Sequence, residues 1–229
     1  MRPLSSFVMT RGTRVEKVGT EDGEISLAYD GDKDAPVVVV LAHGAGSGLD
    51  GDFLTTVATG LAQHGALVCR FNFPYAERGR KAPDPQPVLE ATWRRVLDDI
   101  AQDGRRLVLG GKSMGGRIAS HLVASGTPCD GLIFLGYPLH PPGKPDRLRV
   151  AHLAAISAPI LFVAGTRDPL CPRPTLEETV ARLGGRIEIA FIEGGDHSFR
   201  MRRGSGRSTE QAWKEVTSAS WAWISRLGR

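Results

Sequence analysis

The sequence predicts an α/β fold, with one open, mainly parallel sheet covered by helices on both faces. Short apolar runs alternate with helix-like segments along almost the whole chain, which is typical of such sheets. Several runs, such as PVVVVLA at Pro36–Ala42, are continuously apolar, as in strands buried on both faces. The chain has 229 residues, 41% of them hydrophobic, and no break in composition. We therefore expect a single domain over residues 1–229, with residues 1–20 as an irregular extension.

The strands are expected where short apolar runs end at turn residues. In chain order they are Ile25–Tyr29, Pro36–Ala42, Ala66–Phe73, Arg106–Gly110, Leu132–Leu135, Ile160–Ala164 and Ile187–Ile192. Helices are expected where apolar residues recur at helical spacing. They are Asp52–His64, Val88–Ala101, Met114–Ser125 and Thr209–Leu227. Two proline-rich stretches, Asn72–Pro87 and Tyr137–Ser157, follow strands at the C-terminal edge of the sheet, where ligands bind in open α/β folds.

The composition argues against several classes of protein. The net charge of +4 is mild and mostly spread along the chain, so no general affinity for nucleic acid is expected. The first residues lack the apolar block of a signal peptide, and no run approaches the length of a membrane span. Cys69, Cys129 and Cys171 are far apart and have no metal-ligand spacing, which disfavours a disulfide framework or a zinc site. We expect a soluble cytoplasmic protein without nucleic-acid or membrane partners.

The stretch LVLGGKSMGGR, residues 107–117, allows two interpretations. A P-loop requires a glycine five positions before Gly111, where this chain has Arg106. The alternative pattern, G-x-S-x-G, is fully met by residues 111–115 between a strand-like and a helix-like segment. Ser113 would then occupy a sharp turn, in which its neighbours Gly111 and Gly115 must be small. The sequence therefore favours Ser113 as a nucleophile over Lys112 as a phosphate ligand.

A nucleophilic serine needs a base, and the base needs an orienting acid. In this type of fold the chain order is serine, acid, histidine. His197, in IEGGDHSF, alone among the six histidines lies in a loop just after a late strand. The less suitable histidines are His43, His64, His121, His140 and His152. Asp168 follows the preceding strand and is the expected acid, with Asp196 and Glu193 as rivals.

An acyl-transfer site also needs backbone donors for the oxyanion. The residue after the nucleophile, Met114, and Ala45 in the loop LAHGAGSG are the expected donors. Candidates for substrate contact are His43, Gly44, Tyr75 and Arg78.

The same loop has a second interpretation, as a dinucleotide site. Gly46, Gly48 and Gly51 satisfy G-x-G-x-x-G between a strand and a helix. The ribose-binding acid expected about 20 residues later is missing, and the chain has Arg70 there, which would suit a phosphorylated dinucleotide. The missing acid and the crowded turn at 111–116 argue against this interpretation.

Five motifs in order, HGAG, FNFPYAERGR, GKSMGGR, GTRDPL and GGDHSF, resemble the α/β-hydrolase family and its small, nearly lidless members similar to dienelactone hydrolases. The resemblance covers roughly Ile25 to the C-terminus and implies a triad of Ser113, Asp168 and His197, with no metal or organic cofactor. Dienelactone hydrolases proper have a cysteine nucleophile, so their substrate is not transferred. A branch of uncharacterised hydrolases with testis-expressed and chromatin-complex relatives is closer in motif.

The leading hypothesis is a serine hydrolase of small carboxylic esters or thioesters with a minimal cap, because Tyr137–Ser157 has room for one short helix at most. The alternative is a non-catalytic scaffold that binds a partner protein. Arg78, Arg80 and Lys81 form either a solvated loop or an anion site. The later basic stretch is expected to be a solvated loop, with a gating role left open: Arg200, Arg202, Arg203 and Arg207.

Overall fold

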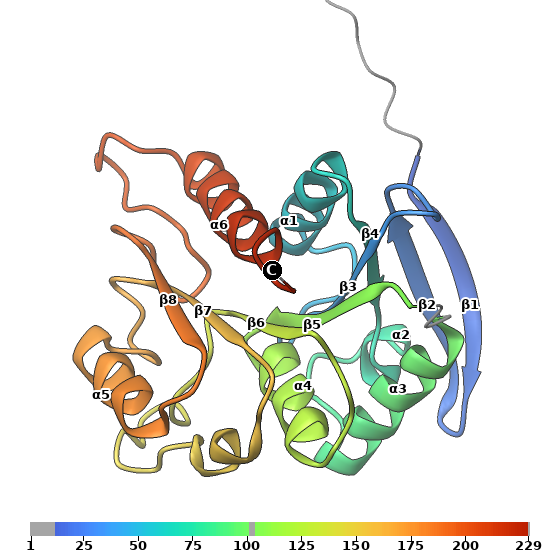
Figure 1. Ribbon diagram of the computed structural model, residues 1–229, viewed down its shortest axis with the longest axis horizontal. Helices are drawn as coiled ribbons and strands as arrows, with labels where there is room; N and C mark the ends of the chain where they lie inside the picture. Colours follow the sequence, from blue (N-terminus) through green and yellow to red (C-terminus); the bar gives the residue numbers. More distant parts are fainter. Residues whose placement is uncertain (1–11, 101–103, 229) are drawn as a thin grey trace, which may run out of the picture.

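An eight-stranded sheet organises the molecule (Figure 1). The computed structural model describes residues 12–100 and 104–228. Its strands are β1 (Arg14–Thr20), β2 (Gly23–Asp30), β3 (Val37–Ala42), β4 (Leu67–Phe71), β5 (Arg106–Lys112), β6 (Gly131–Leu135), β7 (Ile160–Gly165) and β8 (Ile187–Ile192). Their order across the sheet is β1-β2-β4-β3-β5-β6-β7-β8. The α/β sheet predicted from the alternating pattern is confirmed, and each predicted strand has its counterpart.

The sheet is parallel from β4 to β8, and only β1 and β2 run antiparallel to their neighbours. The central strands are buried on both faces, as their apolar runs predict; all six residues of β3 are buried. The expectation of an irregular extension over residues 1–20 is wrong for residues 14–20, which form β1. This strand buries only Val18, so its apolar pattern is weak, and it is held by backbone pairing with β2. Residues 1–11 lie outside the described part of the chain.

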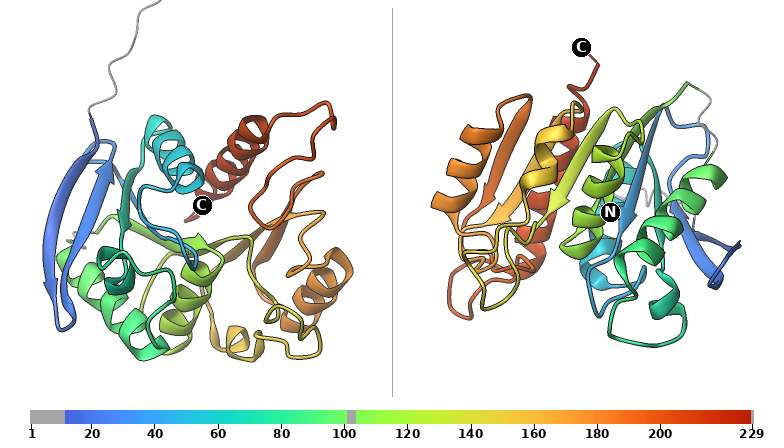
Figure 2. Two further views of the ribbon diagram at one scale, coloured as in Figure 1. Left: turned by 180° about the vertical axis from the view of Figure 1, so that it is seen from behind. Right: turned by 90° about the horizontal axis from the view of Figure 1, so that it is seen from below.

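Helices cover both faces of the sheet (Figures 1 and 2). They are α1 (Asp52–Gln63), α2 (Pro74–Glu77), α3 (Gln86–Asp99), α4 (Met114–Ala124), α5 (Arg173–Leu183), α6 (Thr209–Ile224) and the short 3-10 helix η1 (Ala151–Ala155). On one face lie α1 and α6; on the other lie α3, α4 and α5. The predicted end of α3 at Ala101 falls outside the described residues. Two helices were not predicted, α2 and α5, because prolines precede or begin both of them.

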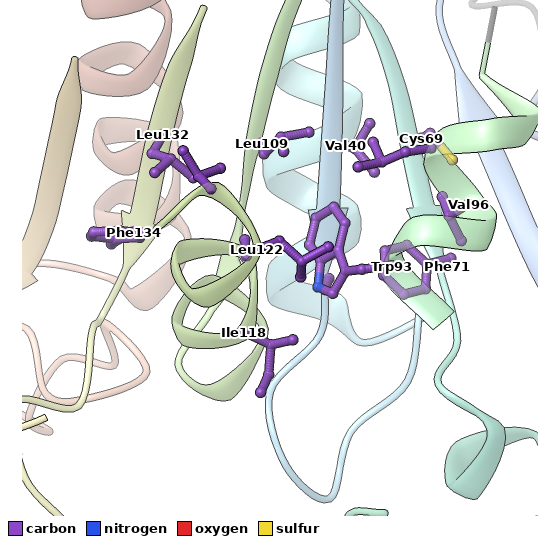
Figure 3. Packing of buried hydrophobic residues seen from close by; sticks show 14 of the residues in the cluster. Val40, Cys69, Phe71, Trp93, Val96, Leu109, Ile118, Leu122, Leu132 and Phe134 are labelled. Carbon is purple, nitrogen blue, oxygen red and sulfur yellow. The ribbon is translucent and has the colours of Figure 1, made fainter. Parts of the chain in front are cut away.

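The core has two apolar layers, one on each face of the sheet. Figure 3 shows part of the larger layer, where Trp93 of α3 lies among strand residues and the apolar side of α4. Trp93, Phe71 and Ile118 are fully buried. At about 25 cal/mol per Å² of buried apolar surface, such side chains dominate the stability of the fold and hold α4 firmly against the strands.

Within residues 12–100 and 104–228, no helix combines the length and the apolar character that crossing a membrane requires.

Candidate active site

The strained turn at Ser113 joins the end of β5 to the start of α4. Ser113 has φ 51° and ψ −112°, a conformation that costs a non-glycine residue about 1–3 kcal/mol. The turn is held by its backbone, because the Ser113 N–H donates to the Leu135 carbonyl at 3.0 Å and the Ser113 carbonyl accepts from the Arg117 N–H at 3.1 Å. The side chain is partly exposed, whereas its neighbours Lys112 and Met114 are buried.

The glycines around Ser113 are required by close backbone contacts. A Cβ on Gly111 or on Gly115 would lie 2.3 Å from the carbonyl oxygen of Ala42, and one on Gly116 would lie 2.8 Å from that of Gly111. Such distances are far below van der Waals contact. The steric reason predicted for these glycines is therefore confirmed, and α4 begins in direct contact with the end of β3.

His197 links Ser113 to a buried carboxylate. Its Nε2 lies 2.9 Å from the Oγ of Ser113, and its Nδ1 lies 2.8 Å from the Oδ2 of Asp168. The Asp168 side chain is completely buried, and its Oδ1 accepts the Leu170 N–H at 2.8 Å. Because an ionised carboxylate only accepts hydrogen bonds, Nδ1 carries the proton of a neutral ring and Nε2 is left to accept the seryl hydroxyl. This arrangement can draw a proton from Ser113 toward His197.

The two rival acids are engaged elsewhere. Asp196 Oδ1 accepts the backbone N–H groups of Ser198 at 2.8 Å and Arg200 at 2.9 Å, so it shapes the loop that carries His197. Glu193 accepts the Thr166 hydroxyl at 3.2 Å at an exposed position. Neither carboxylate has a hydrogen bond to His197 in the described part of the chain.

A second serine and histidine meet where α4 contacts η1. Ser120 Oγ lies 2.8 Å from Nε2 of His152, and it donates its own proton to the Arg117 carbonyl at 2.6 Å. The ring of His152 stacks on His121 with centroids 3.7 Å apart. Burial, together with the positive charges of His121 and Arg117, lowers the pKa of His152 to about 4. Ser120 is fully buried, and its proton is directed at the backbone and not at the imidazole.

The glycine loop after β3 lies beside Ser113. A Cβ on Gly44 would be 3.5 Å from the Cβ of Ser113. His43 is almost fully buried; its Nε2 accepts the Phe73 N–H at 3.2 Å, and its Nδ1 donates to the Gly44 carbonyl at 2.8 Å. Burial lowers the pKa of His43, which keeps this ring neutral. With both ring nitrogens occupied, His43 holds the loop in place beside the cavity.

The expected oxyanion donors are both at the cavity that contains Ser113. Ala45 and Met114 line the same cavity as Ser113. Neither backbone N–H makes a hydrogen bond with any residue in the described ranges. Met114 is moreover the first residue of α4, where an N–H has no partner within the helix. Both groups are therefore free to donate to a ligand.

Arg70 and Asn72, at the end of β4, anchor the other half of the glycine loop. Arg70 is buried, forms an ion pair with Asp30 at 2.8 Å, and donates to the Leu49 carbonyl. Asn72 Oδ1 accepts the Leu49 N–H at 2.7 Å. The dinucleotide interpretation of Arg70 is thus contradicted, because its charge is neutralised inside the protein and cannot meet a phosphate.

Glu77 of α2 extends this anchor to the edge of the sheet. Its Oε1 accepts the Ser26 N–H at 2.7 Å and the Asn72 amide at 2.9 Å, and its Oε2 pairs with Lys17 of β1 at 2.8 Å. Burial alone would raise the pKa of Glu77, but these hydrogen bonds outweigh it and lower the pKa to about 2.

Two candidates for substrate contact lie away from the cavity. Tyr75 is fully buried, and its hydroxyl donates to the Gly44 carbonyl at 3.3 Å. It therefore supports the glycine loop after β3 from within the core. Arg78 donates to the Pro74 carbonyl at 3.1 Å and lies 3.8 Å from Asp84, and it is not among the lining residues. The short helix α2 turns both side chains away from Ser113, which their position after β4 did not reveal.

The cavity at Ser113 has a volume of about 760 Å³ and reaches toward both faces of the sheet. On the α1 and α6 side it is lined by Phe53 and Trp213. On the α3 and α4 side the lining includes Arg117 and Arg149, which the sequence analysis did not single out. Arg117 had a detectable signal, since it follows Ser113 by four residues and so lies on the same side of α4. Only η1 forms within Tyr137–Ser157, as the minimal cap predicts.

Lys112, the rejected phosphate ligand, and the later basic stretch of residues 200–207 have different surroundings. Lys112 is buried at the wall of the cavity, and burial lowers its pKa to about 8 against the opposing effect of Asp168 and Asp196. Arg106, where a P-loop has its first glycine, lies inside β5, so no phosphate-binding loop precedes Lys112. In the later stretch Arg207 pairs with Glu215, while Arg200 lines the cavity.

Comparison with known proteins identifies the family and the fold. A family model described as an alpha/beta hydrolase domain matches residues 35–225. An alpha-beta serine hydrolase homologue from Coxiella burnetii superposes with a TM-score of 0.75 at 18% identity, over 96% of this chain and 100% of the other. A serine hydrolase without lid from Xanthomonas campestris gives 0.74 at 18%, over 100% and 99%. A dienelactone hydrolase from Anabaena variabilis gives 0.75 at 19%, over 95% and 99%. At these identities the likeness concerns the fold.

Proposed function

Because the chain belongs to the α/β-hydrolase family, we propose that it is a serine hydrolase that cleaves small carboxylic esters or thioesters through an acyl-enzyme on Ser113. The observation that carries the proposal is the continuous hydrogen-bond chain from Ser113 through His197 to Asp168, at the wall of a cavity. The structural neighbours include serine hydrolases and dienelactone hydrolases, which is consistent with this chemistry.

In the first half of the proposed reaction, Ser113 Oγ attacks the carbonyl carbon while His197 Nε2 takes the hydroxyl proton. Asp168 stabilises the imidazolium that forms and holds the ring in position. The negative charge on the carbonyl oxygen is stabilised by the free N–H groups of Met114 and Ala45. When the tetrahedral intermediate collapses, His197 returns the proton to the departing alcohol or thiol. The acyl group then remains on Ser113.

In the second half, water attacks the acyl-enzyme from the cavity. His197 takes a proton from the water, the same two N–H groups stabilise the second oxyanion, and the proton passes to Ser113 Oγ as the acid leaves. The segment Tyr137–Ser157, which contains the short helix η1, leaves the cavity open to solvent. An open cavity suits small or extended substrates and allows water to enter. Membership of the testis-expressed and chromatin-complex branch stays a prediction from the five motifs, as does a cytoplasmic location.

A fluorophosphonate probe tests the proposal directly, because it reacts with an activated serine. We expect labelling of the wild type, loss of labelling in Ser113→Ala, and strong loss in His197→Ala. Ser120→Ala is the matched control, since Ser120 also contacts a histidine, and it should label normally. Absence of labelling in the folded wild type would favour the non-catalytic scaffold, and labelling that survives Ser113→Ala would assign the nucleophile to another residue.

A further inference from the structure

Two arginines face the cavity from different elements on the same side of Ser113. Arg117 lies one turn along α4 from the nucleophile, and Arg149 lies just before η1. Both line the cavity together with Ser113. One turn of helix advances about 5.4 Å, so a small ligand that reaches Ser113 can also reach Arg117, and Arg149 lines the same cavity.

Arg117 is oriented by neutral groups. Its Nη1 donates to Oε1 of Gln86 at 3.3 Å and lies 3.3 Å from Nε2 of His121. No carboxylate among the described residues forms an ion pair with it. Glu90, one turn along α3 from Gln86, pairs instead with Arg94 at 3.3 Å. The guanidinium is therefore held in place with its charge unpaired.

Arg149 is fixed through its backbone and not through its side chain. Its N–H donates to the Leu139 carbonyl at 2.7 Å, and its own carbonyl accepts the Tyr137 hydroxyl at 2.8 Å. Its guanidinium makes neither a hydrogen bond nor an ion pair with the part of the chain that the structure describes. By contrast, many other arginines each pair with a carboxylate: Arg70, Arg80, Arg94, Arg173, Arg182, Arg207 and Arg226.

The two unpaired charges also act on each other. Burial, and secondly the charge of Arg149, lowers the pKa of Arg117 against the smaller opposing effects of Tyr137 and Glu90, so the two positive charges are close enough to repel. The acids that line the cavity do not offset them. Asp84 is engaged by Arg80 and Arg78, and Asp52 is exposed at the start of α1, on the other side of the cavity. An anion between the two guanidinium groups would remove this repulsion and accept several charge-assisted hydrogen bonds.

We propose that Arg117 and Arg149 bind an anionic group of the substrate, a carboxylate or a phosphate, while Ser113 attacks an ester or thioester carbonyl elsewhere in the same molecule. This inference rests on the proposed function and specifies its substrate class. The uncharged part of the substrate would contact Phe53 and Trp213 on the opposite side of the cavity.

The test compares esters that differ only in charge. We use 3-acetoxybenzoate against 3-acetoxybenzamide for an anion on the leaving group, and mono-4-nitrophenyl adipate against its monoamide for an anion on the acyl group. In at least one pair, the wild type should show a kcat/KM roughly 10-fold or more higher for the anion, mainly through KM. Added salt should reduce the difference. A further comparison with 3-acetoxyphenyl phosphate distinguishes phosphate from carboxylate as the preferred anion.

Variants assign the preference to the two residues. The ratio of anionic to neutral kcat/KM should fall toward 1 in Arg117→Gln and in Arg149→Gln, and Arg117→Lys should retain part of it. The matched control is Arg182→Gln, an exposed arginine of α5, which should keep the wild-type ratio. Equal rates for both members of both pairs, with hydrolysis that still depends on Ser113, would overturn the inference and leave the proposed function intact.

A binding measurement covers the case in which no ester is hydrolysed. Calorimetry would compare benzoate and phenyl phosphate with benzamide, on the wild type, Arg149→Gln and Arg182→Gln. Tighter binding of either anion that is lost only in Arg149→Gln supports the arginine site even if the esterase proposal fails. Equal binding of all three compounds, or anion binding unchanged in Arg149→Gln, overturns it.

Discussion

Two serines of the α4 segment each contact the Nε2 of a histidine, Ser113 at 2.9 Å and Ser120 at 2.8 Å. They are seven residues apart, or about two helical turns. The distances are nearly equal, but the surroundings are not. Ser113 lies in a strained turn at the cavity, whereas Ser120 is fully buried within the helix.

The difference shows that a short serine–histidine distance does not identify a nucleophile. In the first pair His197 donates to Asp168 and is left to accept the seryl proton. In the second, Ser120 already donates to a backbone carbonyl, so the ring of His152 must be the donor. The direction of the proton, the presence of a carboxylate and access to the cavity separate a proposed catalytic pair from a packing contact.

Removing each hydroxyl gives the largest contrast. Ser113→Ala should lower kcat/KM for a neutral ester by roughly 10⁴-fold or more, because no acyl-enzyme can form. Ser120→Ala should change it by less than about threefold, because that side chain does not line the cavity. Steady-state kinetics on both purified variants checks this. Comparable losses in the two would mean that the serines have been assigned to the wrong roles.

Replacing Asp168, the acid beside His197, should have the next largest effect. Asp168→Asn should lower kcat by roughly 10²–10⁴-fold, because an amide neither stabilises the imidazolium nor fixes its tautomer. KM should change far less. His152→Gln is the control, since it alters the second histidine without touching the first. A loss below about tenfold in Asp168→Asn would transfer the orienting role to another group, with Asp196 the first residue to test.

The Ser120–His152 pair should affect the stability of the protein in acid. The folded-state pKa of His152 is lowered from 6.5 to about 4 by burial and by the charges of His121 and Arg117. Between these two pKa values the unfolded chain binds the proton more readily than the folded protein does. The contribution of His152 to the free energy of unfolding is therefore fully present above about pH 6.5 and is lost as the pH falls toward 4. Thermal unfolding at pH 7.5 and 5 should show a fall in Tm about 2–4 °C smaller in His152→Gln than in the wild type. An identical fall in the two proteins would contradict the prediction.

The sheet and the Ser113 turn could be predicted because their causes are local. Unbroken apolar runs such as β3 permit little except a buried strand, and Gly111 and Gly115 are required by contacts of the turn itself. The edge strand β1 escaped prediction because one buried residue gives no pattern, and its stability comes from a neighbouring strand. Similarly, α5 begins among prolines, which in the sequence read as loop residues.

Side-chain direction was harder to predict than proximity. Tyr75 and Arg78 follow β4 at the correct edge of the sheet, but α2 turns one into the core and the other toward Asp84. Arg149 lies in a proline-rich segment whose path is set by Leu139 and Tyr137, contacts that no local pattern encodes. The sequence thus located the edge of the sheet that carries the cavity, and the tertiary contacts selected the side chains that line it.

The Glu77 carboxylate gives the outer strands a role beyond completing the sheet. It holds β1 through Lys17 and β2 through Ser26, and through Asn72 it reaches the backbone of the loop next to the nucleophile. Because its pKa is about 2, these contacts persist far into acid. The hairpin of β1 and β2 therefore stabilises, through Glu77 and Asn72, the loop that carries the backbone N–H of Ala45, the proposed oxyanion donor.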